Sequence, residues 1–274
     1  MSEQTEAHSA GSTPPQTAMP FAARINVITT TEPWNWLAQG WNDLRRTRWV
    51  GVTYGLIFVV LGYAVTVGLY QLGYYYLVWP MSAGFVLVAP VFAVGIYELS
   101  RKLEAGEPAT FKCLLTAWKR APGRILGFGL AMSFFLILWL RTAALIYVLN
   151  FPYGMLTLQN LLNTTFFSAD GLTFLVVGTV IGAAFAVFAF LISAVSLPMM
   201  LGEKADFLPA LLTSIFAVAR NPRAMLVWAA IIVVVTAAGM ATAFIGLALT
   251  LPLIGHATWH AYRALVKPET GSGR

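Results

Sequence analysis

Five long apolar runs separated by short polar connections limit the folds open to this chain more than any other feature. The runs cover about Val50–Tyr70, Ser82–Leu99, Ile125–Leu149, Leu172–Leu197 and Ala224–Val266. A bilayer crossing takes roughly 20 apolar residues, so each run is close to that length or longer. With 58% hydrophobic and only 10% charged residues, the chain is excluded from the class of ordinary soluble domains.

The last run is too long for a single crossing. Its ~43 residues would form a helix of roughly 65 Å, about twice the thickness of a bilayer. We place a turn near Ala243–Gly246, which makes the run a hairpin. The sequence therefore predicts an all-α polytopic membrane protein with six transmembrane helices.

The basic residues of the connections predict the orientation. They gather before the first span, between the second and third, between the fourth and fifth, and after the sixth, and Arg141 is the single exception among 17. The alternate connections, 71–81 and 150–170, contain neither Lys nor Arg. Cytoplasmic loops are enriched in these residues, so both termini are expected in the cytoplasm. The net charge of +6 then has a membrane explanation and does not indicate nucleic-acid binding.

Each basic connection also contains an amphipathic stretch too short or too polar to span. The three stretches are Trp34–Trp49, Thr110–Arg120 and Ala205–Arg220. In the first, Trp34, Leu37, Trp41 and Leu44 recur at spacings of three and four, which predicts one apolar helix face. We expect three cytoplasmic helices that lie in the membrane interface.

The domain organisation follows from these elements. A single membrane domain is expected over residues 33–267, between a disordered N-terminal tail, 1–32, and a short C-terminal tail, 268–274. One interfacial helix and two spans recur three times, as weak repeat units 33–103, 108–200 and 205–266. True duplication and the shared demands of membrane boundaries both explain this pattern.

Polar residues inside the spans are the candidate functional positions. Arg141 falls in the third span toward the outer leaflet, where Asp170 is its natural partner and extension to the interface is the alternative. His256 and His260 lie four apart on one face of the sixth span and could ligate haem or a transition metal. A hydrogen-bonded structural role is favoured for both, with Glu98 of the second span as the partner of His260.

The familiar catalytic templates are missing from the sequence. It contains no Walker A motif, no G-x-G-x-x-G, no G-x-S-x-G and no H-E-x-x-H. Cys113 is the only cysteine, which excludes an intrachain disulfide and a Cys-rich metal framework. We therefore expect a protein that is not an enzyme and has no catalytic, cofactor-binding or metal-binding residues.

Four local strings resemble one family. They are WLAQGWNDL at Trp36–Leu44, GIYELSRKLEAG at Gly95–Gly106, SAVSLPM at Ser193–Met199 and GHATWHAYR at Gly255–Arg263. The chain is similar, from about Arg24 to Lys267, to a domain-of-unknown-function family of proteobacterial predicted integral membrane proteins. The resemblance implies the bacterial inner membrane and no established activity.

Chains similar to this one are sometimes labelled cytochrome c oxidase subunit I. Haem-copper catalytic subunits are much larger helix bundles with several histidine ligands, and two intramembrane histidines do not fit that pattern. An accessory place in a respiratory complex remains open.

The sequence thus favours a non-enzymatic inner-membrane protein that organises or assists a partner: the lipid bilayer, another membrane protein, or a second copy of itself. The alternative is a small-solute transporter, for which Pro90, Pro198 and Pro252 offer helix breaks. A water-accessible cavity reaching mid-membrane would favour transport, whereas a dry core would favour the accessory role. The polar residues expected to line such a cavity are Arg141, His256, His260, Thr66 and Ser193.

Overall fold

The computed structural model describes residues 24–151 and 158–267, and the regular structure there is helical apart from one isolated β-bridge. Five helical stretches are long and apolar enough to cross a membrane. They are α3 (Trp49–Gln71), α4 with α5 (Val78–Phe92, Val94–Glu104), α7 (Pro122–Asn150), α9 with α10 (Ala169–Ser193, Ser196–Gly202) and α12 (Pro222–Ala241). These stretches confirm an all-helical membrane protein with several apolar spans.

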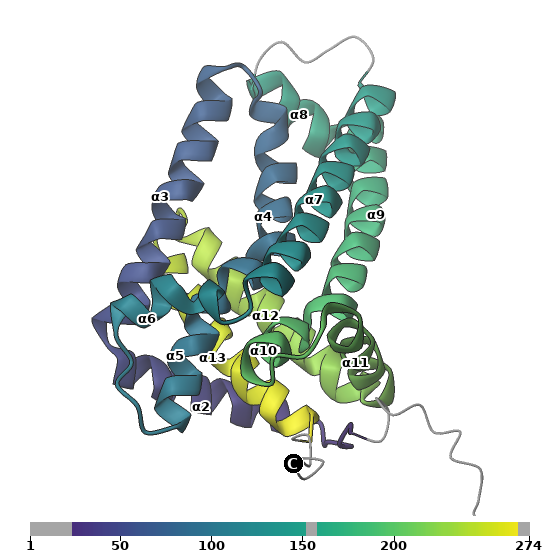
Figure 1. Ribbon diagram of the computed structural model, residues 1–274. Coiled ribbons are helices and arrows are strands. Elements are labelled where there is room, and N and C mark those ends of the chain that lie inside the picture. The colour runs from purple at the N-terminus through teal and green to yellow at the C-terminus, as the bar shows by residue number, and fades with distance from the viewer. Residues whose placement is uncertain (1–23, 152–157, 268–274) are drawn as a thin grey trace, which may run out of the picture.

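Shorter helices connect the long ones. They are α2 (Glu32–Thr47), η1 (Tyr75–Leu77), α6 (Phe111–Thr116), η2 (Ala117–Arg120), α8 (Leu158–Phe167), α11 (Phe207–Arg220) and α13 (Leu247–Leu265). In Figure 1, α2, α6, α10 and α11 gather at one end of the molecule, and α8 lies at the opposite end. We call the first the basic end, because its elements and the adjoining helix ends carry every described Lys and Arg except Arg141. The opposite end is the far end.

The predicted sixth crossing is not confirmed. The expected turn is present between α12 and α13, where Ala243 and Phe244 adopt positive φ angles of 52° and 66°. The second arm of this hairpin, α13, is not among the stretches that qualify as spans in the described ranges. The reason is the polar content of its second half, which carries His256, His260 and Arg263.

The hairpin turn lies beside the middle of α3. The ring of Phe244 is 6.1 Å from that of Tyr63, and a Cβ on Gly62 would lie 3.6 Å from Phe244. After Tyr63, α3 continues for eight residues to Gln71, or roughly 12 Å at 1.5 Å per residue. The α12–α13 hairpin therefore stops short of the far end that α3 reaches.

Close backbone approaches hold α13 among its neighbours. A Cβ on Gly55 of α3 would lie 2.3 Å from the carbonyl oxygen of Ala248, and one on Gly40 of α2 would lie 2.6 Å from the backbone nitrogen of Ala257. Small residues allow helix axes to approach this closely. Most of α13 is buried as a result. It lies among the other helices near the basic end.

The face that α2 turns toward the bundle is mixed in character. Trp34 and Trp41 are 59% and 43% exposed, whereas Trp36, Gly40 and Asp43 are buried. α11 shows the same pattern, because the residues it buries are Ala210, Thr213, Ser214 and Ala217. Helix contacts in membrane proteins use small and polar residues, and in α2 these lie beside the buried Trp36 and Leu44. The helices thus occur where the sequence predicts them, with a mixed face toward the bundle.

Two of the spans are broken near the basic end. α4 ends just before Ala93, three residues after Pro90. α9 ends just before Ala194 and Val195. At the second break the backbone N–H of Val195 donates to Oγ of Ser214, which itself donates to the carbonyl of Leu191. Serine side chains commonly satisfy the backbone groups that a broken membrane helix leaves open.

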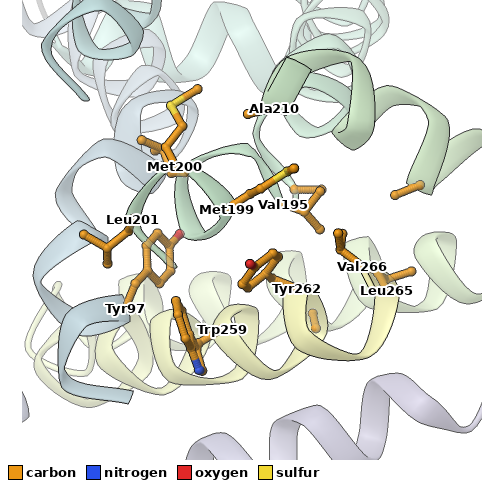
Figure 2. Packing of buried hydrophobic residues seen from close by; sticks show 14 of the residues in the cluster. Tyr97, Val195, Met199, Met200, Leu201, Ala210, Trp259, Tyr262, Leu265 and Val266 are labelled. Carbon is orange, nitrogen blue, oxygen red and sulfur yellow. The ribbon is translucent and has the colours of Figure 1, made fainter. Parts of the chain in front are cut away.

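A large core fills the basic end below these breaks. Figure 2 shows side chains of α5, α10 and α13 gathered there, including Tyr97, Leu201, Trp259 and Tyr262. Each of these four side chains is at most 2% exposed. The breaks therefore turn α5 and α10 into a compact layer against α13.

The N-terminal segment is ordered over part of the predicted tail. Ile25 pairs with Val266, and the Asn221 side chain donates to the carbonyl of Asn26 and accepts from the N–H of Ile28. The predicted disorder up to residue 32 does not hold for residues 24–31, because these contacts fix them against the end of α13 and the start of α12. The rest of that tail and residues 268–274 lie outside the described residues.

Candidate functional site

Five polar side chains meet where α2, α5 and α13 pack together, and we call them the buried polar cluster. They are Asp43 and Thr47 from α2, Ser100 from α5, and His256 and His260 from α13. All are buried except His260, which is partly exposed. Residues three, four or seven positions apart share a helix face, which brings Asp43 and Thr47 to one side of α2 and the two histidines to one side of α13.

The hydroxyl of Ser100 is the centre of this cluster. It donates to Oδ2 of Asp43 over 2.8 Å and lies 2.7 Å from Nδ1 of His256. A hydroxyl has one proton to donate, so this geometry requires His256 to donate from Nδ1 to Ser100. Nε2 of the neutral ring is then an acceptor. The Thr47 hydroxyl lies 3.4 Å from it and also lies 3.1 Å from the carbonyl oxygens of Asp43 and Leu44 in its own helix, to which it can donate instead. One chain of hydrogen bonds thus joins three helices.

Asp43 accepts a second hydrogen bond, from Nε2 of His260 at 2.8 Å. Burial raises the pKa of Asp43, whereas the hydrogen bonds from His260 and Ser100 lower it, and the net shift is downward from the ordinary value of 3.8. The carboxyl group is therefore ionised at neutral pH. A buried carboxylate held by donors from two other helices ties α2 to the bundle.

Glu98 does not pair with His260, so that prediction is wrong. Its carboxylate accepts from Nε and one terminal nitrogen of Arg101, each at 2.8 Å, and lies 3.5 Å from Nε of Arg120. Two residues along an α-helix turn the side chain by roughly 200°, so Glu98 and Ser100 face different sides of α5. Ser100 faces α13, and Glu98 faces η2.

Both histidines already have hydrogen-bond partners within the buried polar cluster. Nδ1 of His256 is bonded to Ser100, and Nε2 of His260 is bonded to Asp43. Within residues 24–151 and 158–267, no group of three or more His, Cys, Asp and Glu side chains is arranged to hold a metal ion. The histidine pair thus acts here as part of a hydrogen-bond network.

Arg141 and Asp170 are not brought together. Both side chains are exposed, and no ion pair within 4.0 Å joins them. Asp170 lies in the first turn of α9, where a negative charge interacts favourably with the helix N-terminus. Extension of Arg141 to the interface, the alternative interpretation, requires an exposed position such as this one.

A second polar group lies near the surface between α5, α10 and α13. Glu104 accepts from the indole N–H of Trp259 and from Nε of Arg263, each at 2.9 Å. Glu203 pairs with Arg24 from the N-terminal segment. A cleft of about 320 Å³ between these groups also contains Tyr262. Like the buried polar cluster, this group joins elements far apart in the sequence.

An apolar cavity of about 330 Å³ lies above the basic end, among α3, α4, α5, α9, α12 and α13. Aliphatic and aromatic side chains make up nearly all of its wall, and Phe58, Phe190, Trp228 and Ile254 represent four of the helices. Ser193 is the single member of the predicted transport-lining set in this wall. The cavity is thus apolar where a path for a polar solute would need polar groups.

The buried polar cluster contains residues that the sequence analysis missed. Asp43, Thr47 and Ser100 were not singled out from the sequence as partners of the histidines. A signal was present, because Trp36, Gly40, Asp43 and Thr47 recur at spacings of four, three and four. The prediction considered only the apolar residues of this stretch and assigned them to the membrane interface.

Comparison with known proteins gives one family match. The model of a family described as predicted integral membrane protein (DUF2189) matches residues 78–202. No curated protein and no solved structure matches the chain. The matched residues run from α4 through α10 and contain Glu98 and Ser100, whereas Asp43 and the two histidines lie outside them. Over residues 78–202 the chain is therefore a match to the DUF2189 family of predicted integral membrane proteins, as its sequence strings indicated.

Proposed function

We propose that this protein is a non-enzymatic, multi-pass protein of the bacterial inner membrane that assists or organises a membrane partner or the bilayer itself. The observation that carries the proposal is the pairing of its buried charges. Asp43 and Glu98, the buried carboxylates of the described residues, are held by donors from within the chain. Groups engaged in this way link helices, and all members of the buried polar cluster except His260 are buried away from the surface.

A transporter for a small polar solute is the second candidate, and the apolar cavity argues against it. Its wall contains Ser193 but not Arg141, Thr66 or either histidine. Two of its hydroxyl groups, those of Tyr54 and Thr258, donate to backbone carbonyls at 2.7 Å. A polar solute in this space would find few groups to replace its water shell.

The orientation with both termini in the cytoplasm is part of the proposal. It is supported by the collection of the described Lys and Arg residues at the basic end, because such residues favour the cytoplasmic side. The three short helical segments α2, α6 with η2, and α11 also lie at that end, which suits helices at the cytoplasmic interface.

Cys113 provides a direct test of this orientation. It is the only cysteine of the chain and lies in α6 at the basic end. A hydrogen bond from Thr110 is the main cause of a lowered pKa for this thiol, which favours the reactive thiolate. A membrane-impermeant maleimide should label Cys113 in inverted vesicles and leave it unlabelled in intact spheroplasts.

A matched reporter at the far end completes the experiment. In a Cys113→Ser background, Tyr74→Cys places a thiol in the exposed connection after α3. It should show the opposite pattern, with labelling in spheroplasts. Labelling of Cys113 from outside would contradict the proposed orientation.

Partner capture tests the accessory role. The protein is purified from native membranes in a mild detergent, and co-purifying proteins are identified by mass spectrometry, with an unrelated multi-pass protein of similar abundance as the control. The proposal expects one or a few membrane proteins, respiratory subunits included, enriched over the control. Flux of solutes into vesicles containing the protein alone would favour the transporter.

A further inference from the structure

We propose that the apolar cavity binds an acyl chain of a membrane phospholipid. This inference goes beyond the accessory role, which requires no ligand inside the bundle. The volume of about 330 Å³ lies within the range of roughly 300–1,000 Å³ typical of small-molecule sites.

The position of the cavity brings it into contact with lipid. Its wall comes mainly from stretches that qualify as membrane spans, including residues of α4, α9 and α12. Val187 of α9 and Val233 of α12 belong to this wall and are 58% and 63% exposed. Exposed valines on apolar spans face the hydrocarbon of the bilayer, so the cavity is open to acyl chains.

The chemistry of the wall selects a hydrocarbon. No charged side chain lines the cavity, and its hydroxyl groups are few: those of Tyr54 and Thr258 donate to backbone carbonyls, and Tyr97, Ser193 and Thr236 carry the others. Water gains too few hydrogen bonds in such a space to remain there. An empty apolar space would lose the dispersion contacts of its wall, and a hydrocarbon chain restores them.

The helix breaks create the cavity. Pro90 and Ala93 at the first break, Ala194 at the second, and Pro252 and Gly255 of α13 all contribute to its wall. The breaks direct α5 and α10 into the basic end and leave an opening above them.

The terminal segments are mostly polar and therefore poor occupants. Residues 1–17 are rich in Ser, Thr, Glu and Gln, and residues 268–274 contain Glu, Thr, Ser and Arg. Burying such side chains in an apolar cavity would leave their polar groups without partners. The surrounding bilayer is an abundant source of apolar chains.

Photo-crosslinking of the whole protein tests the proposal. The protein is reconstituted in vesicles that contain a phosphatidylethanolamine with a diazirine in one acyl chain, and labelled residues are mapped by mass spectrometry. We expect label on Phe190 and Ile254, which line the cavity and are only partly exposed. Label is also expected on Leu226 and Val180, which lie on the outer surface.

Matched variants separate a bound chain from the surrounding lipid. Ala186→Phe and Ala229→Phe place a large ring in the wall of the cavity, on α9 and α12. Ala184→Phe and Ala230→Phe make the same change on the same helices outside the wall. The first pair should reduce the label on Ile254 to background, and the second pair should leave it unchanged.

Two results would overturn the proposal. One is a wild-type protein labelled at Leu226 and Val180 but not at Phe190 or Ile254, a measurement that needs no folded variant. The other is equal labelling of Ile254 in both pairs of variants. If the phenylalanine variants do not fold, Ala186→Leu and Ala229→Leu against Ala184→Leu and Ala230→Leu repeat the comparison with smaller side chains.

Discussion

The hydroxyl of Ser100 lies 2.7 Å from Nδ1 of His256 and joins α5 to α13. The Ser100 hydroxyl also donates a hydrogen bond to the carboxylate of Asp43 on α2. Two residues that lie 57 positions apart in the sequence thus share a single hydrogen bond. The buried polar cluster depends on this hydroxyl for its continuity.

Replacing Ser100 with alanine should destabilise the protein. Ser100→Ala leaves Nδ1 of His256 buried without an acceptor, and an unsatisfied buried polar group costs about 1–3 kcal/mol. Thermal unfolding in a nonionic detergent measures the effect. Ser133→Ala is the control, because the exposed Ser133 hydroxyl donates only to the carbonyl of Gly129 in its own helix. Equal unfolding temperatures for both variants would show that the cluster adds little stability.

A double-mutant cycle should find coupling between Asp43 and His260. The changes Asp43→Asn and His260→Gln remove a hydrogen bond to a charged group, for which roughly 1.5–3 kcal/mol is expected. Glu98→Gln and His260→Gln should be additive, because Glu98 pairs with Arg101 and Arg120. The reverse result, with coupling to Glu98 and none to Asp43, would contradict the arrangement described for α5 and α13.

Acid should weaken the fold partly through Asp43. The pKa of Asp43 lies below 3.8 in the folded protein, so its carboxylate adds stability above about that pH. This stability is lost as the pH falls through the lowered pKa, when the folded protein must take up the proton. Unfolding temperatures measured between pH 7 and pH 3 should fall less steeply for Asp43→Asn than for the wild type. If the unfolding temperatures of the wild type and of Asp43→Asn fall in parallel as the pH is lowered, Asp43 does not contribute to the loss of stability in acid.

Two glycines should respond oppositely to alanine. Gly55→Ala drives a methyl group to within 2.3 Å of the carbonyl oxygen of Ala248, and overpacking of this kind costs about 1–3 kcal/mol. Gly127→Ala meets no atom within 4 Å on α7 and should gain up to about 1 kcal/mol from helix propensity. Unfolding temperature again provides the measurement. A stabilising effect at both positions would mean that α3 and α13 are farther apart than described.

Charge reversal should not rescue Arg141. Because Arg141 and Asp170 form no ion pair, the double change Arg141→Asp with Asp170→Arg should give no more folded protein than the worse single change. Size-exclusion chromatography of the detergent-solubilised protein measures the folded yield. Recovery of the wild-type yield in the double variant would restore the ion pair as an interpretation.

Hydrophobicity alone predicted much of the fold. Each apolar run corresponds to one or more helices, and the hairpin turn lies where the length of the last run required it, at Ala243 and Phe244. Length and composition did not predict how far the hairpin reaches. The reach of the hairpin depends on the close contact of Gly55 with Ala248, which sets the position of α13 along α3. A hydropathy pattern does not contain this contact.

The candidate site was predicted only in part. His256 and His260 were recognised because polar residues inside an apolar run are conspicuous, and their hydrogen-bonded role was the favoured interpretation. Asp43 was overlooked because it lies in a connection where charged residues are expected to be solvated. Its burial depends on the contact of Gly40 with Ala257, which brings the polar side of α2 against α13.

The limited reach of the α12–α13 hairpin has a consequence for the surrounding membrane. Because the hairpin ends beside Tyr63, α12 and α13 add to the cross-section of the bundle near the basic end and not at the far end that α3 reaches. A body of this tapered shape occupies more area in one leaflet than in the other. In the proposed orientation the larger area falls in the cytoplasmic leaflet.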